Sequence, residues 1–297
     1  MIITSENLAL AFKGFKAVYT DAFMTAPAHA DKISMKVTSN SADETYGWLG
    51  AFPSMREWIG PRIIKNLMAQ DFTIKNRKFE ATLGVKRDSI SDDKLGLFKP
   101  MFAEMGQGAR RHPEELVFGL LKSGFTSACY DRQNFFDTDH PVTDEAGVVS
   151  LVSNTQAGAS PAWFLLDTSR AVRPIIWQER EGYELQSVTD SNDERVFLTD
   201  EYLYGVRARV NAGFGLWQLA YGATTPLNAS NYAAARAAMM GFKSNDGRIL
   251  GVTPTVLVVP PSLESAALHL LNTEITDGGV SNPWKGTADL IVTPYLG

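Results

Sequence analysis

The chain has 297 residues but only one cysteine, Cys129. A single cysteine excludes an internal disulfide and a zinc site made of several cysteines. No stretch approaches the roughly 20 consecutive apolar residues that a membrane helix needs. The first residues lack a basic leader followed by a long apolar run, so we expect no signal peptide. We therefore expect a soluble protein made in a reducing cytosol, with no membrane partner.

An excess of positive charge is also missing. The chain has 28 Lys and Arg against 33 Asp and Glu, and its net charge is −5. A protein that neutralises many phosphates usually has a basic excess or a basic stripe. One basic cluster, Arg110 and Arg111, is followed at once by Glu114 and Glu115. The composition therefore disfavours sequence-specific DNA binding and leaves passive contact with nucleic acid open.

Common catalytic motifs are absent as well. The sequence contains no phosphate-binding GxxxxGK[ST] or GxGxxG loop and no GxSxG elbow of a serine hydrolase. Cys129 follows an apolar helical pattern, which predicts a buried structural thiol. His29 and His112 have no catalytic partner at a usable spacing, and His269 lies in a predicted helix. No constellation supports an enzyme.

One loop does concentrate groups that could perform chemistry. Asp137, Asp139 and His140 lie within the four residues DTDH. Carboxylates and an imidazole can together bind a divalent cation, so a metal-dependent hydrolase is the alternative hypothesis. No companion motif such as HExxH supplies further ligands. We favour turn-capping carboxylates and a surface or hydrogen-bonded histidine, with no catalytic residue, metal or cofactor.

Periodicity predicts the elements of the first half. An apolar stripe predicts a helix that begins at Ser5 as its N-cap. Residues 25–47 lose this periodicity, so we expect a surface arm that ends in a flexible or extended link. Strict alternation over Phe79–Lys86 predicts a strand, with Phe72–Ile74 as its partner. The residues KNRK between them, centred on Asn76, predict a projecting charged hairpin.

Helices are predicted over residues 92–124. Ser91 or Asp92 is the expected cap, and Gly124 is the expected stop. Pro100 and Pro113 favour kinks or a break over one straight helix, with Pro113 in the first turn of a second helix.

The second half alternates strands and helices. Residues 163–180 and 202–222 are expected to form strands. The last seventy-odd residues predict helix, strand, helix and strand, which is typical of an α/β subdomain.

Four stretches in this order resemble the major head subunit (major capsid protein) family of phage Mu and Mu-like prophages. They are ETYGWLGAFPSMREWIGPRIIKNL, FTIKNRKFEATLGVKRDSISDDKLGLFKPMFAEMG, HPEELVFGLL and CYDRQNFFDTDHPV. The resemblance covers nearly the whole chain and is weakest in the first forty residues.

This resemblance implies an α+β fold, the tailed-phage major capsid fold of the Hong Kong phage type. Residues 1–45 would form an N-terminal arm and residues 46–90 an extended β-hairpin loop with its tip near Lys75–Arg77. Residues 91–225 would form a peripheral domain with a spine helix, and residues 226–297 an axial domain.

The resemblance also implies a structural protein of the virion that assembles, in the host bacterial cytoplasm, into an icosahedral shell around phage DNA. Its expected partners are further copies of itself in pentamers and hexamers, with scaffold, portal and decoration proteins, and packaged DNA through non-specific contact only. Aromatic and basic side chains commonly anchor interfaces. The candidate intersubunit contacts are Trp48, Arg56, Trp58, Lys75, Arg77 and Lys78.

Overall fold

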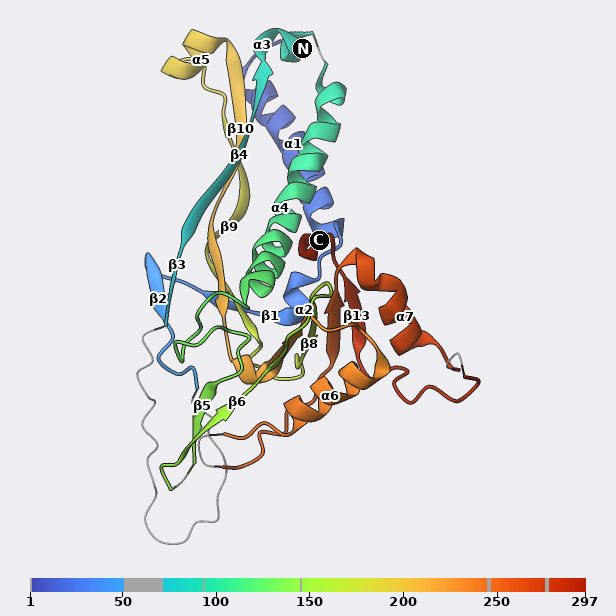
Figure 1. Cartoon of the computed structure of the whole chain (residues 1–297). Coiled ribbons are helices and arrows are strands. Elements are labelled where there is room, and N and C mark those ends of the chain that lie inside the picture. The colour runs from blue at the N-terminus through green and yellow to red at the C-terminus, as the bar shows by residue number, and fades with distance from the viewer. Residues whose placement is uncertain (1, 51–71, 93, 145, 245–246, 276–277) are drawn as a thin grey trace.

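The computed structural model describes residues 2–50, 72–92, 94–144, 146–244, 247–275 and 278–297. Figure 1 shows a long ribbon of strands with two helices along it, joined to a broader body. The helices of the described residues are α1 (Ser5–Thr25), α2 (Ala30–Ile33), α3 (Arg87–Ser91), α4 (Leu95–Ser123), α5 (Glu194–Thr199), α6 (Ala229–Met240) and α7 (Glu264–Asn272). Their strands are β1 (Ser34–Thr38), β2 (Asp43–Thr45), β3 (Thr73–Lys75), β4 (Arg77–Lys86), β5 (His140–Thr143), β6 (Val149–Val152), β7 (Thr155–Gln156), β8 (Trp163–Leu166), β9 (Ile175–Val188), β10 (Glu201–Phe214), β11 (Ala220–Ala223), β12 (Val256–Val259) and β13 (Asp289–Val292).

The ribbon is a four-stranded sheet with the order β1-β9-β10-β4. β9 and β10 have 14 residues each and pair antiparallel. β4 pairs antiparallel with β10, and β1 pairs parallel with β9. Buried and less buried side chains alternate along most of β10, with Tyr202, Tyr204 and Val206 on the buried side. The strand predicted over residues 202–222 is confirmed up to Phe214. A short 3-10 turn, Trp217–Leu219, then separates it from β11.

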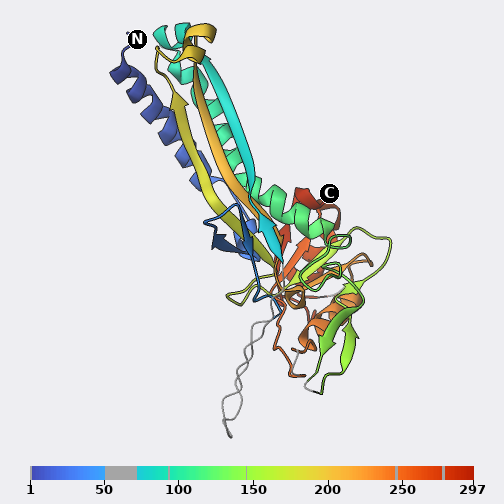
Figure 2. The same cartoon turned by 90° about the vertical axis from the view of Figure 1, so that its left-hand side faces the viewer.

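Helices α1 and α4 lie along this ribbon in both views (Figures 1 and 2). Phe15 of α1 stacks on Phe102 of α4, with ring centroids 4.1 Å apart, and both rings meet Tyr204 of β10 edge-on. The helix predicted at the start of the chain is confirmed. Its N-cap is Thr4 rather than Ser5, because the Thr4 hydroxyl accepts the N–H of Asn7 at 3.2 Å.

Helix α4 runs without a break through 29 residues and includes both prolines. Of the two predicted alternatives, kinks or a break, the break is therefore wrong, and so is Pro113 as the start of a second helix. Each interior proline removes one backbone hydrogen bond, and an interior proline costs about 3 kcal/mol. Burial of Phe102, Val117, Phe118 and other apolar side chains on one face offsets this cost. The helix adapts by bending, as Figure 2 shows, and it ends at Gly124 as predicted.

The segment expected to be a surface arm is built into the ribbon and the body. Ala30 and Ile33 of α2 are buried, and β1 extends the sheet beside β9. The carboxylate of Glu114 on α4 accepts the backbone N–H groups of His29 and Ala30 at 2.7 and 2.5 Å. A buried carboxylate satisfies two donors at the start of α2, which fixes this segment on α4.

The predicted hairpin between residues 72 and 85 is wrong in its pairing. β3 pairs with β2, whereas β4 pairs with β10. Asn76 joins β3 to β4 and makes no turn between paired strands. Its side-chain amide donates to Ser39 Oγ at 2.7 Å and to the Ser41 carbonyl at 3.0 Å, and its oxygen accepts from Gln178 at 2.9 Å. No hairpin tip therefore lies at Lys75–Arg77.

The rest of the expected extended loop, residues 51–71, lies outside the described residues. The proposed division of the chain at residues 45, 90 and 225 stays a prediction.

The body contains a five-stranded sheet with the order β13-β12-β8-β11-β7. All four residues of each of the strands β8, β11 and β12 are buried, and α6 and α7 pack beside the sheet. The helix, strand, helix and strand predicted for the last seventy-odd residues are confirmed. The sheet also includes β7, β8 and β11, which precede residue 226. In the described parts of the chain, no helix has both the length and the apolar character needed to cross a bilayer.

Gly106 sets the distance between α1 and α4. A Cβ atom at this position would overlap the carbonyl oxygen of Tyr19 and would lie 3.2 Å from the Cβ of Ala22. Because this obstacle is backbone, it cannot rotate away. Gly108 is on the same helix but is exposed, and a Cβ there would meet nothing within 4 Å.

We predict that Gly106→Ala lowers the free energy of unfolding by about 1–3 kcal/mol, because it forces the two helices apart. Gly108→Ala is the matched control and should stabilise by up to about 1 kcal/mol through helix propensity. Urea unfolding of the unassembled variants measures both. Equal effects of the two substitutions would show that the helices do not pack through Gly106.

Candidate assembly surface and the Cys129–Asp131–His140 cluster

The DTDH loop caps a turn between α4 and β5. Asp137 accepts the backbone N–H groups of Asn134 and Thr138 at 3.0 and 2.8 Å. Partial burial favours the neutral form of Asp137, but these backbone donors outweigh it and hold its pKa below the ordinary value. A side-chain hydrogen bond to Asp137 raises the pKa of Asp139. The prediction of turn-capping carboxylates is confirmed for Asp137.

His140 forms its hydrogen bonds with residues other than Asp137 and Asp139. Its side chain is fully buried, so the hydrogen-bonded alternative is confirmed and the surface alternative is wrong. The ring stacks on Trp217 with centroids 4.0 Å apart. Nδ1 lies 2.7 Å from Asp131 Oδ2, and Nε2 lies 3.2 Å from Asn154 Oδ1. Because Asn154 Oδ1 also accepts the N–H of Asp137, it acts as an acceptor, and His140 Nε2 is therefore the donor.

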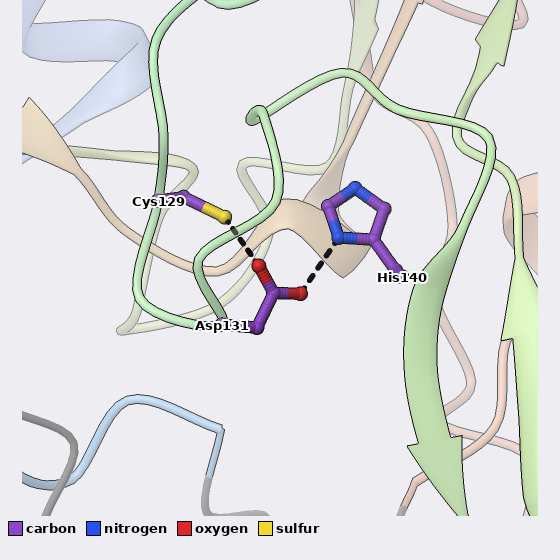
Figure 3. A group of neighbouring side chains, drawn as sticks. All are labelled: Cys129, Asp131 and His140. Carbon is purple, nitrogen blue, oxygen red and sulfur yellow. Dashed lines mark hydrogen bonds and ion pairs between the residues drawn. The ribbon is translucent and has the colours of Figure 1, made fainter.

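Cys129, Asp131 and His140 together have the composition of a metal site (Figure 3). The Cys129 thiol donates to Asp131 Oδ1 at 3.1 Å. Four ligands about 2.0–2.3 Å from a zinc ion would lie roughly 3.2–3.7 Å from one another. The observed separations of 2.7 and 3.1 Å are instead hydrogen-bond distances.

The state of the thiol supports the same interpretation. Burial, followed by the nearby Asp131 carboxylate, raises the pKa of Cys129 far above its ordinary value. A nucleophile requires the thiolate, so this buried thiol is poorly suited to nucleophilic chemistry. The prediction of a buried structural cysteine is confirmed. The cluster is a polar network that holds residues 129–140 against the body.

Sequence reasoning missed Asp131 and Asn154, because these partners have no motif spacing. Asn154 lies 14 residues from His140, and its amide donates to the carbonyl of Phe135 at 2.8 Å. The sequence offers a weak indication only: CYD places Asp131 two residues after the cysteine.

The predicted basic contacts are close in the chain, at the junction of β3 and β4. Lys75 ends β3, opposite Asp43 of β2, whereas Arg77 and Lys78 begin the edge strand β4 and point to its opposite faces. Lys75, Arg77 and Lys78 are exposed, and the three are called the basic patch below. Asn76 fixes the backbone beneath them through Ser39, Ser41 and Gln178. Arg77 lies over the Phe79 ring at 5.1 Å. Within the described ranges, none of the three cations makes an ion pair with a carboxylate.

The predicted tryptophan contacts, unlike the basic ones, are not exposed side chains where the structure describes them. Trp48 is partly buried, packs against the core of the body and meets Tyr46 edge-on at 6.1 Å. Trp48 therefore packs on its own subunit. Arg56 and Trp58 lie outside the described residues.

We predict that Asp131→Ala lowers the free energy of unfolding by about 3–5 kcal/mol, because it leaves the buried His140 Nδ1 without its partner. Asp139→Asn keeps a side chain that can bond to Asp137 and should change stability by less than about 0.5 kcal/mol. Urea titration of both variants, read by tryptophan fluorescence, tests the difference. Parental stability of Asp131→Ala would contradict the assigned network.

Comparison with known proteins covers the whole chain. The family model described as Mu-like prophage major head subunit gpT matches residues 8–296. The major capsid protein of Escherichia phage Mu is 41% identical over 305 residues, with 100% of each chain covered.

Solved structures agree with this. A chain of the bacteriophage JBD30 procapsid matches with a TM-score of 0.89 and 45% identity, covering 99% of this chain and 100% of that chain. A chain of the JBD30 capsid decorated with minor capsid protein trimers matches with a TM-score of 0.77 and 33% identity, covering 93% of each.

The expected α+β phage capsid fold of the Hong Kong type is confirmed, and so is the expectation of a structural protein rather than an enzyme. None of the relatives named above supports the metal-dependent hydrolase. From its sequence and its fold, this chain belongs to the Mu-like prophage major head subunit family.

Proposed function

We propose that this chain is the subunit of a phage head shell and that its function is association with further copies of itself. One observation carries the proposal, namely the match to a procapsid chain over 99% of this chain at a TM-score of 0.89. Shell subunits act through surfaces, so the chemistry of this function is that of interfaces.

The ribbon supplies such a surface. β4 is an edge strand of ten residues, and most of its side chains are exposed. Edge strands that must avoid indiscriminate pairing commonly carry charged side chains. Here Lys78, Glu80 and Lys86 are exposed along β4. A charged edge disfavours random strand addition but permits a specific partner with complementary charge.

We also propose that the basic patch contacts neighbouring copies. Its three cations lack ion-pair partners among the residues that the structure describes, and their backbone is fixed by Asn76. A fixed, unpaired set of charges can bind a complementary surface with little loss of backbone entropy.

Further partners are extensions of this proposal. The decorated JBD30 capsid supports a minor capsid protein as a partner. The family resemblance implies the remaining parts of the proposal. The copies form pentamers and hexamers, with a scaffold and a portal as partners and only non-specific contact with packaged DNA. Assembly takes place in the host cytoplasm, before incorporation into the virion.

The test is electron microscopy of the purified protein, alone at high concentration and co-expressed with the scaffold protein of its own prophage. We predict closed shells, or rings of five or six subunits. Metal analysis and a hydrolase assay on the same sample examine the alternative function. Monodisperse monomer under all these conditions would contradict the proposal.

A further inference from the structure

Helix α5 forms an ordered projection at the far end of the ribbon from the basic patch (Figure 1). Val196 anchors it, with only 2% of its surface exposed. Asp193 caps its start by accepting the N–H of Arg195 at 2.9 Å. Asp200 ends it in the left-handed conformation, and its carbonyl accepts the N–H of Arg87. We call residues 190–201 the α5 knob.

Two large apolar side chains of the α5 knob point away from this anchor. Phe197 is 80% exposed and Leu198 is 71% exposed. The helix therefore buries one apolar side chain on its own subunit and leaves two larger ones in water. Adjacent exposed apolar side chains with a charged surround are typical of an interface.

The surround is acidic. The α5 knob contains Asp190, Asp193, Glu194, Asp200 and Glu201 but only one basic residue, Arg195, so its formal charge is −4. Within the described residues, Asp200 lies 3.9 Å from Arg87, and both side chains are well exposed. Such a pair neutralises little of the charge.

The basic patch and the α5 knob lie at opposite ends of the same strand pair. Arg77 pairs with Val210 at one end, and Lys86 pairs with Glu201 at the other. The nine residue steps between them span about 30 Å at roughly 3.3 Å per residue. Charges in water are screened over about 8 Å at physiological salt. The two surfaces therefore cannot neutralise each other within one chain.

We infer that the α5 knob of one copy docks on the basic patch of a neighbouring copy. The inference rests on the proposed shell function, which supplies neighbouring copies. Carboxylates of the α5 knob meet cations of the basic patch along the edge of β4, and the exposed Phe197 ring packs under one of them, as the Phe79 ring already packs under Arg77. Because two different surfaces meet, the contact is head-to-tail and can close into rings.

A double-mutant cycle on the full chain tests this contact. The patch variant is Lys75→Gln, Arg77→Gln and Lys78→Gln. The knob variant is Asp190→Asn, Glu194→Gln and Asp200→Asn. Asn keeps an acceptor for the turn at 190 and tolerates the left-handed backbone at 200. The measurement is the critical protein concentration for shell formation at low salt.

We expect each variant alone to raise this concentration about tenfold, which corresponds to about 1.4 kcal/mol per subunit. The combined variant should also raise it about tenfold, because both changes remove the same contact. The control neutralises three exposed carboxylates elsewhere, with Glu6→Gln, Asp21→Asn and Glu104→Gln, and should leave it unchanged.

Two outcomes would overturn the contact. A hundredfold rise in the combined variant would show that the two surfaces bind different partners, such as a minor capsid protein. A knob variant that assembles like the parent would show that the α5 knob is free in the shell. In both cases parental shells still form, so the proposed function stands. Absence of shells from the parent chain would instead refute the proposed function itself.

If the knob variant fails to fold, Phe197→Ala provides a second test of the contact. It changes no capping residue and removes a side chain that makes little contact with its own subunit. Thermal unfolding of the unassembled protein should be unchanged, while the critical concentration rises. An unchanged critical concentration would count against docking of the α5 knob.

Discussion

The antiparallel pairing of β9 with β10 is the interaction on which the rest of the structure depends. These two strands hold β1 and β4 at their edges, and α1 and α4 lie along the ribbon that results. One end of the pair enters the core of the body through Ile175, Ile176 and Phe214. The other end carries α5. The pairing thus fixes how far apart the α5 knob and the basic patch lie on one chain. We propose that the knob of one copy meets the patch of a neighbouring copy.

The remaining architecture keeps this ribbon rigid against the body. Glu114 joins α4 to α2, and the Asp131–His140 network joins the turn after α4 to the body. Both are buried polar contacts whose groups are paired, and such contacts favour one arrangement over many. A shell repeats each subunit contact many times, so small errors in subunit shape would accumulate. Rigid joints between ribbon and body are therefore consistent with a subunit that acts through its surfaces.

Local patterns predicted much of this fold. The alternation in β10, the stripe of α1 and the order of elements after residue 226 all follow from side-chain periodicity, which burial of one face imposes. Partners distant in sequence could not be predicted in this way. Asn76 is a residue typical of turns, yet its amide bonds to Ser39 and Gln178. Pro113 suggested a new helix, but the buried face of α4 outweighed its cost. Function followed from the family resemblance, because shell assembly leaves no catalytic motif.

In the proposed shell, the two charged ends of the ribbon bring neighbouring copies together. A cryo-electron microscopy reconstruction of the assembled shell tests it most directly. We predict Phe197 and Glu194 of one copy within contact distance of Lys75, Arg77 or Lys78 of a neighbour. A reconstruction in which the α5 knob faces solvent, or in which the basic patch contacts only DNA or another protein, would rule out this contact.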